Sequence, residues 1–192
     1  MEELEAVQAL IDAMEATGMD YVLVGSLASS HFGLIRTTED ADFVIRATTD
    51  QLAKLKSATQ SVWQWEPQTA FDPVTGKTRH LLHLGKTRFK AELFELEQDD
   101  FDLSRMNRRV RRKARGRQRF VQTPEDIIVQ KLRWYKALER SKDWNDLHPV
   151  IAAQEGKLDW PYIREWCQRL ELTDLLDKAL ATLPGRKSTD EK

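Results

Sequence analysis

Two short apolar segments with polar residues at their ends constrain this chain most. Tyr21–Val24 is an apolar run that stops at Gly25-Ser26, as a buried strand does before a tight turn. The second segment, Asp40–Ile45, begins with Asp-Ala-Asp and continues with Phe-Val-Ile. Because side chains alternate between the two faces of a strand, Asp40 and Asp42 are predicted to lie on the same face.

Two carboxylates side by side repel each other unless a cation neutralises them. Oxygen ligands of this kind suit magnesium or manganese, so the pair predicts a divalent-metal site. A strand that ends in Gly-Ser and opens a helix presents backbone N–H groups and a hydroxyl to a phosphate. Together these features predict phosphoryl or nucleotidyl transfer. The alternative, two solvated aspartates near a strand end, stays open.

The combined motif resembles the signature of the nucleotidyltransferase superfamily related to DNA polymerase beta. The matching residues are Gly25-Ser26 and Arg36-x-Thr38-x-Asp40-x-Asp42, followed by apolar residues. Within the superfamily, the sequence is most similar to small bacterial nucleotidyltransferases, which include toxins of toxin–antitoxin and abortive-infection systems. The resemblance covers about residues 20–150 and implies an α/β fold: a small mixed sheet flanked by helices, with a helical C-terminal part.

The resemblance also implies roles for individual residues. Asp40 and Asp42 would be catalytic and would bind Mg²⁺ or Mn²⁺. Glu92, in Lys90-Ala91-Glu92-Leu93, matches the third catalytic and metal-binding carboxylate, which is commonly aspartate in the superfamily. Glu95 is predicted to point to the opposite face and is the less favoured choice for this role. The implied nucleotide-binding residues are Gly25, Ser26, Arg36, Thr38 and Lys131.

Two of these assignments have structural alternatives. Glu92 also fits a solvated strand glutamate that has no catalytic role. Lys131 falls between apolar positions of a predicted helix, at the edge of its buried face, and also fits a surface lysine whose stem packs against apolar residues.

Residues 105–119, the arginine-rich segment, contain nine arginines and lysines and no acid, although the formal net charge of the chain is −1. Such a cluster attracts nucleic-acid phosphates by counterion release. A solvated arm paired with the preceding acids is the alternative. The candidate nucleic-acid-binding residues are Arg108, Arg109, Arg111, Arg112, Lys113 and Arg115.

Composition limits the classes of protein. With 192 residues, the chain suits a nucleotidyltransferase-like domain over 1–122, a helical part over 123–183 and a polar tail over 184–192. The single cysteine, Cys167, excludes an internal disulfide and a cysteine-based zinc site. The acidic N-terminus is unlike a signal peptide, and no apolar run reaches membrane length, so a cytoplasmic protein is expected.

Periodicity and capping residues predict further elements. Lys142-Asp143 and Asp146-Leu147 match a pattern of the small nucleotidyltransferases, and both aspartates are predicted to cap a helix. The other predictions are a helix over 4–14, a strand over 62–65, a loop or turn over 71–76, a hairpin with arms 79–84 and 87–96, a helix that starts near Phe101 or Leu103 from the acidic stretch 98–102, and helices that begin at Thr123-Pro124, Asp159 and Thr173.

These inferences predict a metal-dependent nucleotidyltransferase that moves a nucleoside monophosphate from a triphosphate to a hydroxyl. The acceptor choices are a tRNA 3′ end, a protein hydroxyl and a small molecule such as an aminoglycoside, and the arginine-rich segment favours RNA. A toxin-like role would add an antitoxin partner. The alternative function is an inactive protein of this fold that binds nucleic acid or a protein through the arginine-rich segment. A metal nuclease with a Glu-x-Lys strand is rejected, because here the lysine precedes Glu92.

Overall fold

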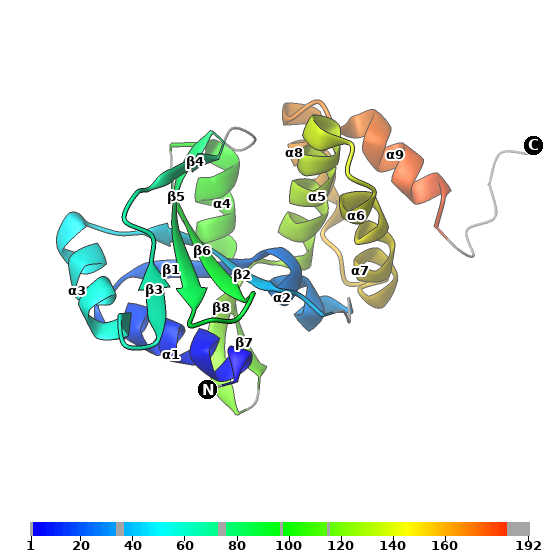
Figure 1. Cartoon of the computed structure of the whole chain (residues 1–192). Coiled ribbons are helices and arrows are strands. Elements are labelled where there is room, and N and C mark those ends of the chain that lie inside the picture. Colours follow the sequence, from blue (N-terminus) through cyan, green and yellow to red (C-terminus); the bar gives the residue numbers. More distant parts are fainter. Residues whose placement is uncertain (1, 34–36, 73–75, 97, 115, 184–192) are drawn as a thin grey trace, which may run out of the picture. The chain divides into compact units, whose positions relative to one another are not determined.

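The computed structural model describes residues 2–33, 37–72, 76–96, 98–114 and 116–183, and Figure 1 shows how these residues fold. They divide into two compact units. Unit 1 comprises Met1–Ala28 and Arg36–Gln122, and unit 2 comprises Ser29–Ile35 and Thr123–Lys192. The α/β class with a mixed sheet and C-terminal helices is confirmed, although segment 29–35 groups with those helices.

The described residues of unit 1 form an eight-stranded mixed sheet in the order β3-β5-β6-β2-β1-β8-β7, with β4 paired to β5. The central strand β2 is antiparallel to β1 and parallel to β6, and β1 is parallel to β8. The bounds are β1 Asp20–Val24, β2 Asp40–Arg46, β3 Trp63–Trp65, β4 Ala70–Asp72, β5 Lys77–Leu84, β6 Lys90–Glu95, β7 Val110–Ala114 and β8 Arg117–Val121.

The central strands are buried on both faces. On one face, Val22, Val24 and Val44 cluster with Met106 of α4 (Asp100–Arg108). The opposite face carries Tyr21, whose hydroxyl bonds to Glu15 of α1 (Glu3–Ala16) at 2.9 Å. Helix α3 (Thr49–Thr59) is joined to the end of α1 by hydrogen bonds from the Gln51 side chain to the backbone oxygens of Thr17 and Gly18. Helices thus cover both faces of the sheet (Figure 1).

Most predicted strands of unit 1 are confirmed, and one prediction is wrong. The strands at 21–24, 40–46 and 62–65 and the hairpin β5–β6 occur as expected. Phe71 and Asp72, assigned to a loop, instead belong to β4, which pairs with β5 through Phe71↔Thr78. Gly76, the last residue of that predicted loop, lies in a turn as expected, and residues 73–75 lie outside the described residues.

Unit 2 is helical in its described part. Thr123 caps α5 as predicted, with its hydroxyl accepting from the Asp126 N–H, and Pro124 is the first helical residue. Asp159 caps α8 by accepting from the Tyr162 N–H. Cys167 is buried in α8, and burial raises the pKa of its thiol to about 12. The helices are α5 Pro124–Leu138, α6 Ser141–Asn145, α7 Leu147–Ala153, α8 Trp160–Arg169 and α9 Thr173–Ala181.

The short segment after β1 joins the two units in sequence. It contains α2 (Gly25–Ser29) and the 3₁₀ helix η1 (Ser30–Phe32), which matches the predicted short helix. Gly33 follows with φ +111°, and a Cβ there would lie 2.2 Å from the Cβ of Ala153 in α7. This glycine therefore lets the backbone at Gly33 pass close to α7 within unit 2.

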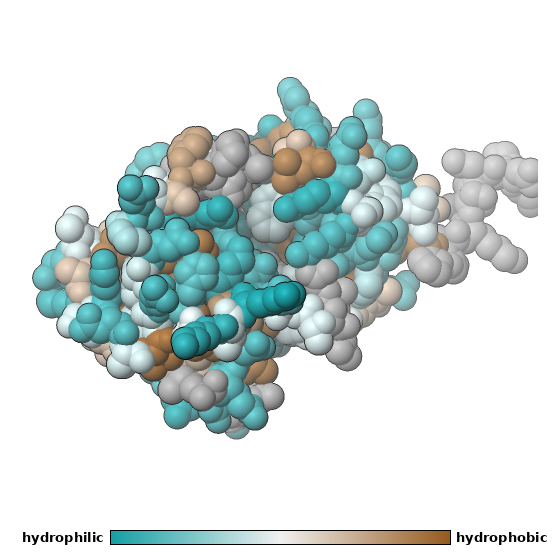
Figure 2. Space-filling model, in the orientation of Figure 1, coloured by the Kyte–Doolittle hydropathy of each residue, from teal (hydrophilic) through white to brown (hydrophobic). Residues whose placement is uncertain are grey.

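The visible surface is mostly hydrophilic, with hydrophobic residues in separate small patches (Figure 2). Among the described residues, the large hydrophobic side chains that are exposed are Phe71 and Leu138. No helix within the described part of the chain is long and apolar enough to cross a membrane.

Candidate active site

The turn after β1 lies directly against Asp42. Strand β1 pairs with β2 so that Val24 is opposite Asp42, and Gly25 follows Val24. Gly25 has a φ of +65°, and a Cβ on it would lie 2.1 Å from Oδ2 of Asp42. A residue other than glycine would therefore clash with the carboxylate as well as strain the backbone. The Gly-Ser turn and Asp42 form one site, and Ser26 is buried at the start of α2.

Asp40 lies on the same face as Asp42. The burial pattern of β2 alternates at this end: Asp40 and Asp42 are half-buried, whereas Ala41 and Phe43 are fully buried on the other face. Thr38 donates its hydroxyl to Oδ1 of Asp40 at 2.6 Å and so fixes the orientation of that carboxylate. Arg36, predicted to bind the nucleotide, lies outside the described residues.

Glu92 is the neighbour of Asp42 on the parallel strand β6, where the two residues are in register. Its carboxylate is already engaged by two cations. Oε2 accepts from Nη1 of Arg79 at 2.6 Å, and Oε1 accepts from Nζ of Lys90. Asp40, Asp42 and Glu92 together form the carboxylate face. Glu95 points to the opposite face, as predicted, and its Oε1 lies 2.8 Å from Nε2 of His80.

The carboxylate face continues into an apolar surface further along the same strands. Val44 and Phe94 follow Asp42 and Glu92 by two residues, and both pack in the cluster that contains Met106 of α4. Phe94 therefore lies on the face of Lys90 and Glu92, which explains its departure from the polar–apolar alternation of β6. One face thus has a polar end with carboxylates and an apolar end covered by α4.

The carboxylate face fits a divalent cation in part. Asp40 and Asp42 offer hard oxygen ligands on one half-buried face, which is the donor chemistry that Mg²⁺ and Mn²⁺ prefer. Both oxygens of Glu92 accept hydrogen bonds from Arg79 and Lys90 instead. Within the described residues, no three His, Cys, Asp or Glu side chains are grouped as metal ligands. The two aspartates fit a cation better than Glu92 does.

Arg79 and Lys90 were not identified as site residues from the sequence. Lys90 had a local signal, because it precedes Glu92 by two residues and so shares its face. Arg79 had none, since its position beside Glu92 depends on the pairing of β5 with β6, in which it is opposite Phe94.

Lys131 belongs to unit 2 and is buried among carboxylates of that unit. Its Nζ lies 3.0 Å from Oδ1 of Asp143 and 2.7 Å from Oδ2 of Asp146. Asp143 also accepts from Nε of Arg140 at 2.8 Å. The predicted capping role of the two aspartates is wrong: neither α6 nor α7 has a side-chain cap, and both carboxylates bind Lys131 instead. Lys131 is therefore more deeply buried than the predicted edge position.

The arginine-rich segment spans the end of α4 and the hairpin β7–β8, and many of its cations have partners within unit 1. The buried Arg105 pairs with Asp102 at 2.6 Å. Arg109 donates to Oδ1 of Asp20 at 2.7 Å, and its guanidinium lies over the ring of Phe120. The Arg105 pair is internal to α4, whereas Arg109, the residue after α4, contacts strands β1 and β8.

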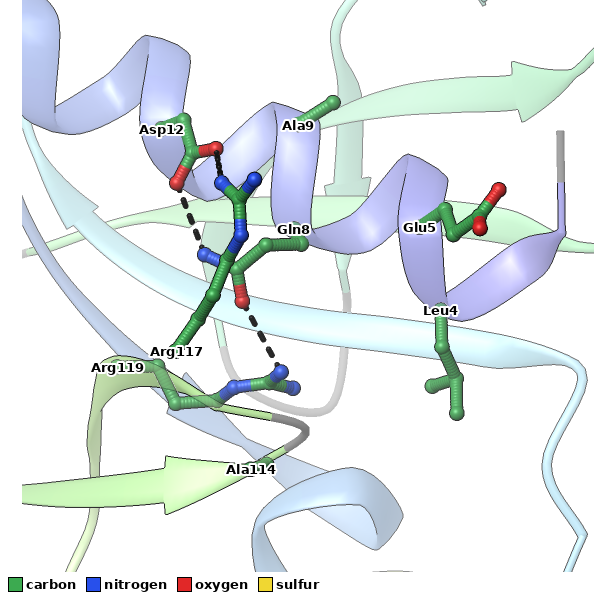
Figure 3. A pocket seen from close by; sticks show the side chains of 8 residues that line it. All are labelled: Leu4, Glu5, Gln8, Ala9, Asp12, Ala114, Arg117 and Arg119. Carbon is green, nitrogen blue, oxygen red and sulfur yellow. Dashed lines mark hydrogen bonds and ion pairs between the residues drawn. The ribbon is translucent and has the colours of Figure 1, made fainter.

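Two more of these arginines contact side chains of helix α1, as Figure 3 shows. Arg117 pairs with Asp12, and the buried Arg119 donates to Oε1 of Gln8 at 3.0 Å. With other residues of α1 and the hairpin, they line a cavity of about 410 Å³. Because Arg119 shares its face with Val121 and Leu23, this cavity lies on the sheet face opposite the carboxylate face.

The candidate nucleic-acid-binding residues therefore have unequal exposure. Arg111, Arg112 and Lys113 are exposed on β7, at the edge of the sheet. Arg108 and Arg109 are half-buried, and Arg115 lies outside the described residues. The exposed positive charge is concentrated on one strand.

Comparison with known proteins gives a fold and no sequence family. No family model matches the sequence, and the search of curated proteins finds no match. Among solved structures, a nucleotidyltransferase-like antigenic protein from Paracoccidioides brasiliensis superposes with a TM-score of 0.56 at 17% identity, covering 93% of this chain and 92% of that one.

The structure of ANT(2″)-Ia in complex with adenylyl-2″-tobramycin superposes with a TM-score of 0.62 at 9% identity, covering 88% of this chain and 96% of that one. The fold is therefore that of nucleotidyltransferase-like proteins.

Proposed function

We propose that this protein transfers a nucleoside monophosphate from a nucleoside triphosphate to a hydroxyl acceptor. One observation carries the proposal: the turn at Gly25 lies in contact distance of the carboxylate of Asp42, with Asp40 beside it on the same strand face. The fold shared with nucleotidyltransferase-like proteins supports this function.

The residues of the site have separate tasks in this reaction. Asp40 and Asp42 would hold a divalent cation, and the Thr38 hydroxyl fixes the orientation of the Asp40 carboxylate. The bound cation would neutralise phosphate charge and polarise the α-phosphoryl group. Gly25 and Ser26 bind the β- and γ-phosphates through the turn that opens α2. The acceptor hydroxyl oxygen attacks the α-phosphorus and its proton is released to solvent, while the bond between the α-phosphorus and the oxygen that bridges to the β-phosphate breaks and pyrophosphate leaves.

The role of Lys131 as a contact of the triphosphate remains a prediction from the sequence. It belongs to unit 2, where Asp143 and Asp146 hold its ammonium group. The same holds for a toxin-like role and an antitoxin partner, which rest on the sequence resemblance alone.

RNA is the proposed acceptor. Arg111 and Lys113 are two residues apart on an edge strand and therefore place two exposed cations on one face, which suits contact with a phosphate backbone. Small hydroxyl compounds are the competing class, because the fold is shared with a protein solved in complex with an adenylylated tobramycin. If the carboxylates proved inactive, the same cations would support the second function, nucleic-acid or protein binding without catalysis.

The test incubates the full chain with Mg²⁺, total RNA and each α-³²P-labelled nucleoside triphosphate in turn. Parallel reactions replace the RNA with an aminoglycoside mixture or contain no acceptor other than the protein itself. Label is expected in RNA, and Asp40→Asn or Asp42→Asn should lower the transfer by at least about 10³-fold, because each removes a metal ligand. Asp50→Asn, an exposed aspartate of α3, is the matched control.

Full transfer by both site variants would contradict the proposed chemistry. Label in the aminoglycosides and not in RNA would retain the chemistry and replace the acceptor. RNA binding without transfer by the parent protein would support the non-catalytic function.

A further inference from the structure

Glu92 is held by two cations on the sheet face that carries the aspartates. The residue is 5% exposed, and each of its oxygens accepts a hydrogen bond from a cation. A buried carboxylate must be compensated by partner charges or by a bound ion. In this chain Arg79 and Lys90 supply that compensation, so Glu92 has no charge left for an ion to neutralise.

The two cations lie on the same face of the sheet as the aspartates. Lys90 is in register with Asp40, and Arg79 is in register with Phe94, which shares the face of Glu92. A metal ion bound beside Glu92 would meet the ammonium of Lys90 and the guanidinium of Arg79 at close range, and both cations would repel it.

We propose that Glu92 is a positioning residue that anchors Arg79 and Lys90, and that Asp40 and Asp42 alone hold one divalent ion. The inference rests on the proposed function, since it concerns the metal site of that reaction. Lys90 then supplies a compact fixed positive charge where a third carboxylate would otherwise recruit another metal ion.

The exposure of Lys90 gives this charge access to a ligand. Its side chain is 35% exposed, compared with 7% for that of Glu92. The ammonium group is thus held by Glu92 from the protein side and remains open to phosphate oxygens on the other side. A neutral side chain at position 90 would remove this attraction and would also remove the repulsion that a metal ion at Asp40 experiences.

Mn²⁺ binding to the full chain, counted by the EPR signal of free Mn²⁺, tests the inference without an assay of activity. The key variant is Glu92→Gln/Lys90→Met, which removes one negative and one positive charge and so preserves the net charge of the site. Its Mn²⁺ affinity is expected to stay within about threefold of the parent, whereas Asp42→Asn should lose at least about tenfold. Asp50→Asn/Lys54→Met, an exposed pair on α3, is the matched control.

A second variant gives a result that a purely structural role cannot produce. Lys90→Met alone is expected to tighten Mn²⁺ binding by about tenfold, because a like charge beside Asp40 is gone. The parent is expected to bind one Mn²⁺ per chain. Melting curves identify any variant that fails to fold. If the double variant fails to fold, Lys90→Met alone still tests the inference.

The outcomes separate the inference from the proposed function. If the double variant loses as much affinity as Asp42→Asn, Glu92 is a metal ligand and the inference fails while the function stands. Unchanged or weaker binding by Lys90→Met would also overturn the inference. If Asp42→Asn binds Mn²⁺ as well as the parent, the metal site itself is wrong, and the proposed function fails with the inference.

Discussion

The carboxylate face and the arginine-rich segment are both parts of unit 1, and both concentrate one sign of charge in the sequence. At the carboxylate face the charges stay together in space, because Asp40, Asp42 and Glu92 lie on neighbouring parallel strands in register. In the arginine-rich segment the charges separate: Arg105 and Arg119 are buried, and Arg112 is exposed.

The cause of the difference is the element that carries each group. In a strand, residues two apart always share a face, so Asp-x-Asp brings its carboxylates together wherever the strand lies. A run of arginines that crosses the end of a helix and a hairpin sends its side chains in several directions. A high density of charge in a sequence therefore predicts a charged surface only when the backbone keeps the side chains on one face.

The largest expected effect concerns the buried part of the arginine-rich segment. Arg105→Ala should destabilise the fold by about 3–5 kcal/mol, because it leaves the fully buried Asp102 without this cation. Arg112→Ala, at an exposed position of the same segment, should change the free energy of unfolding by less than about 0.5 kcal/mol. Urea unfolding of both variants measures the contrast. Equal losses in the free energy of unfolding would show that the two arginines of this segment contribute alike to stability.

An intermediate effect is expected at the turn beside the carboxylate face. Gly25→Ala should cost about 2–3 kcal/mol of stability, because it combines backbone strain with a clash against Asp42. Gly116→Ala is the control, since Gly116 has a φ of +82° and a Cβ added there would have no atom within 4 Å; it should cost only about 1 kcal/mol. Thermal unfolding compares the two. A smaller loss for Gly25→Ala would contradict the close approach of turn and carboxylate.

The smallest effect is expected from the hydrogen bond that orients Asp40. Thr38→Val removes the 2.6 Å bond from its hydroxyl to Oδ1 of Asp40, at a cost to stability of about 1 kcal/mol. Mn²⁺ affinity should fall by about threefold to tenfold, as for other residues that orient metal ligands. Thr37→Val changes an exposed neighbour and should leave the affinity unchanged. Identical affinities for the two variants would remove Thr38 from the site.

The sequence predicted those features that depend on local rules. The strand at Asp40–Arg46 follows from alternation, and the start of α5 follows from Thr123 and Pro124. It did not predict contacts between distant segments. Phe71 reads as a loop residue because nothing nearby shows that it pairs with Thr78. Arg117 and Arg119 read as surface cations because their partners, Asp12 and Gln8, are 105 and 111 residues away.

The same limit applies to the candidate site. Asp40, Asp42 and the Gly25 turn were identified because a strand, a turn and a second strand follow one another in the chain. The cations on Glu92 were missed because Arg79 reaches that carboxylate only through the register of β5 on β6. Long-range register, which sequence periodicity does not encode, thus decides which cations contact Glu92.

The most direct test of the central claim is the anomalous scattering of Mn²⁺ in crystals of the full chain grown with the ion. We expect a single peak bound by carboxylate oxygens of both Asp40 and Asp42, at about 2.1–2.2 Å, with Glu92 still bonded to Arg79 and Lys90. Crystals in which Mn²⁺ binds elsewhere, or in which the two aspartates hold no metal, would contradict the claim.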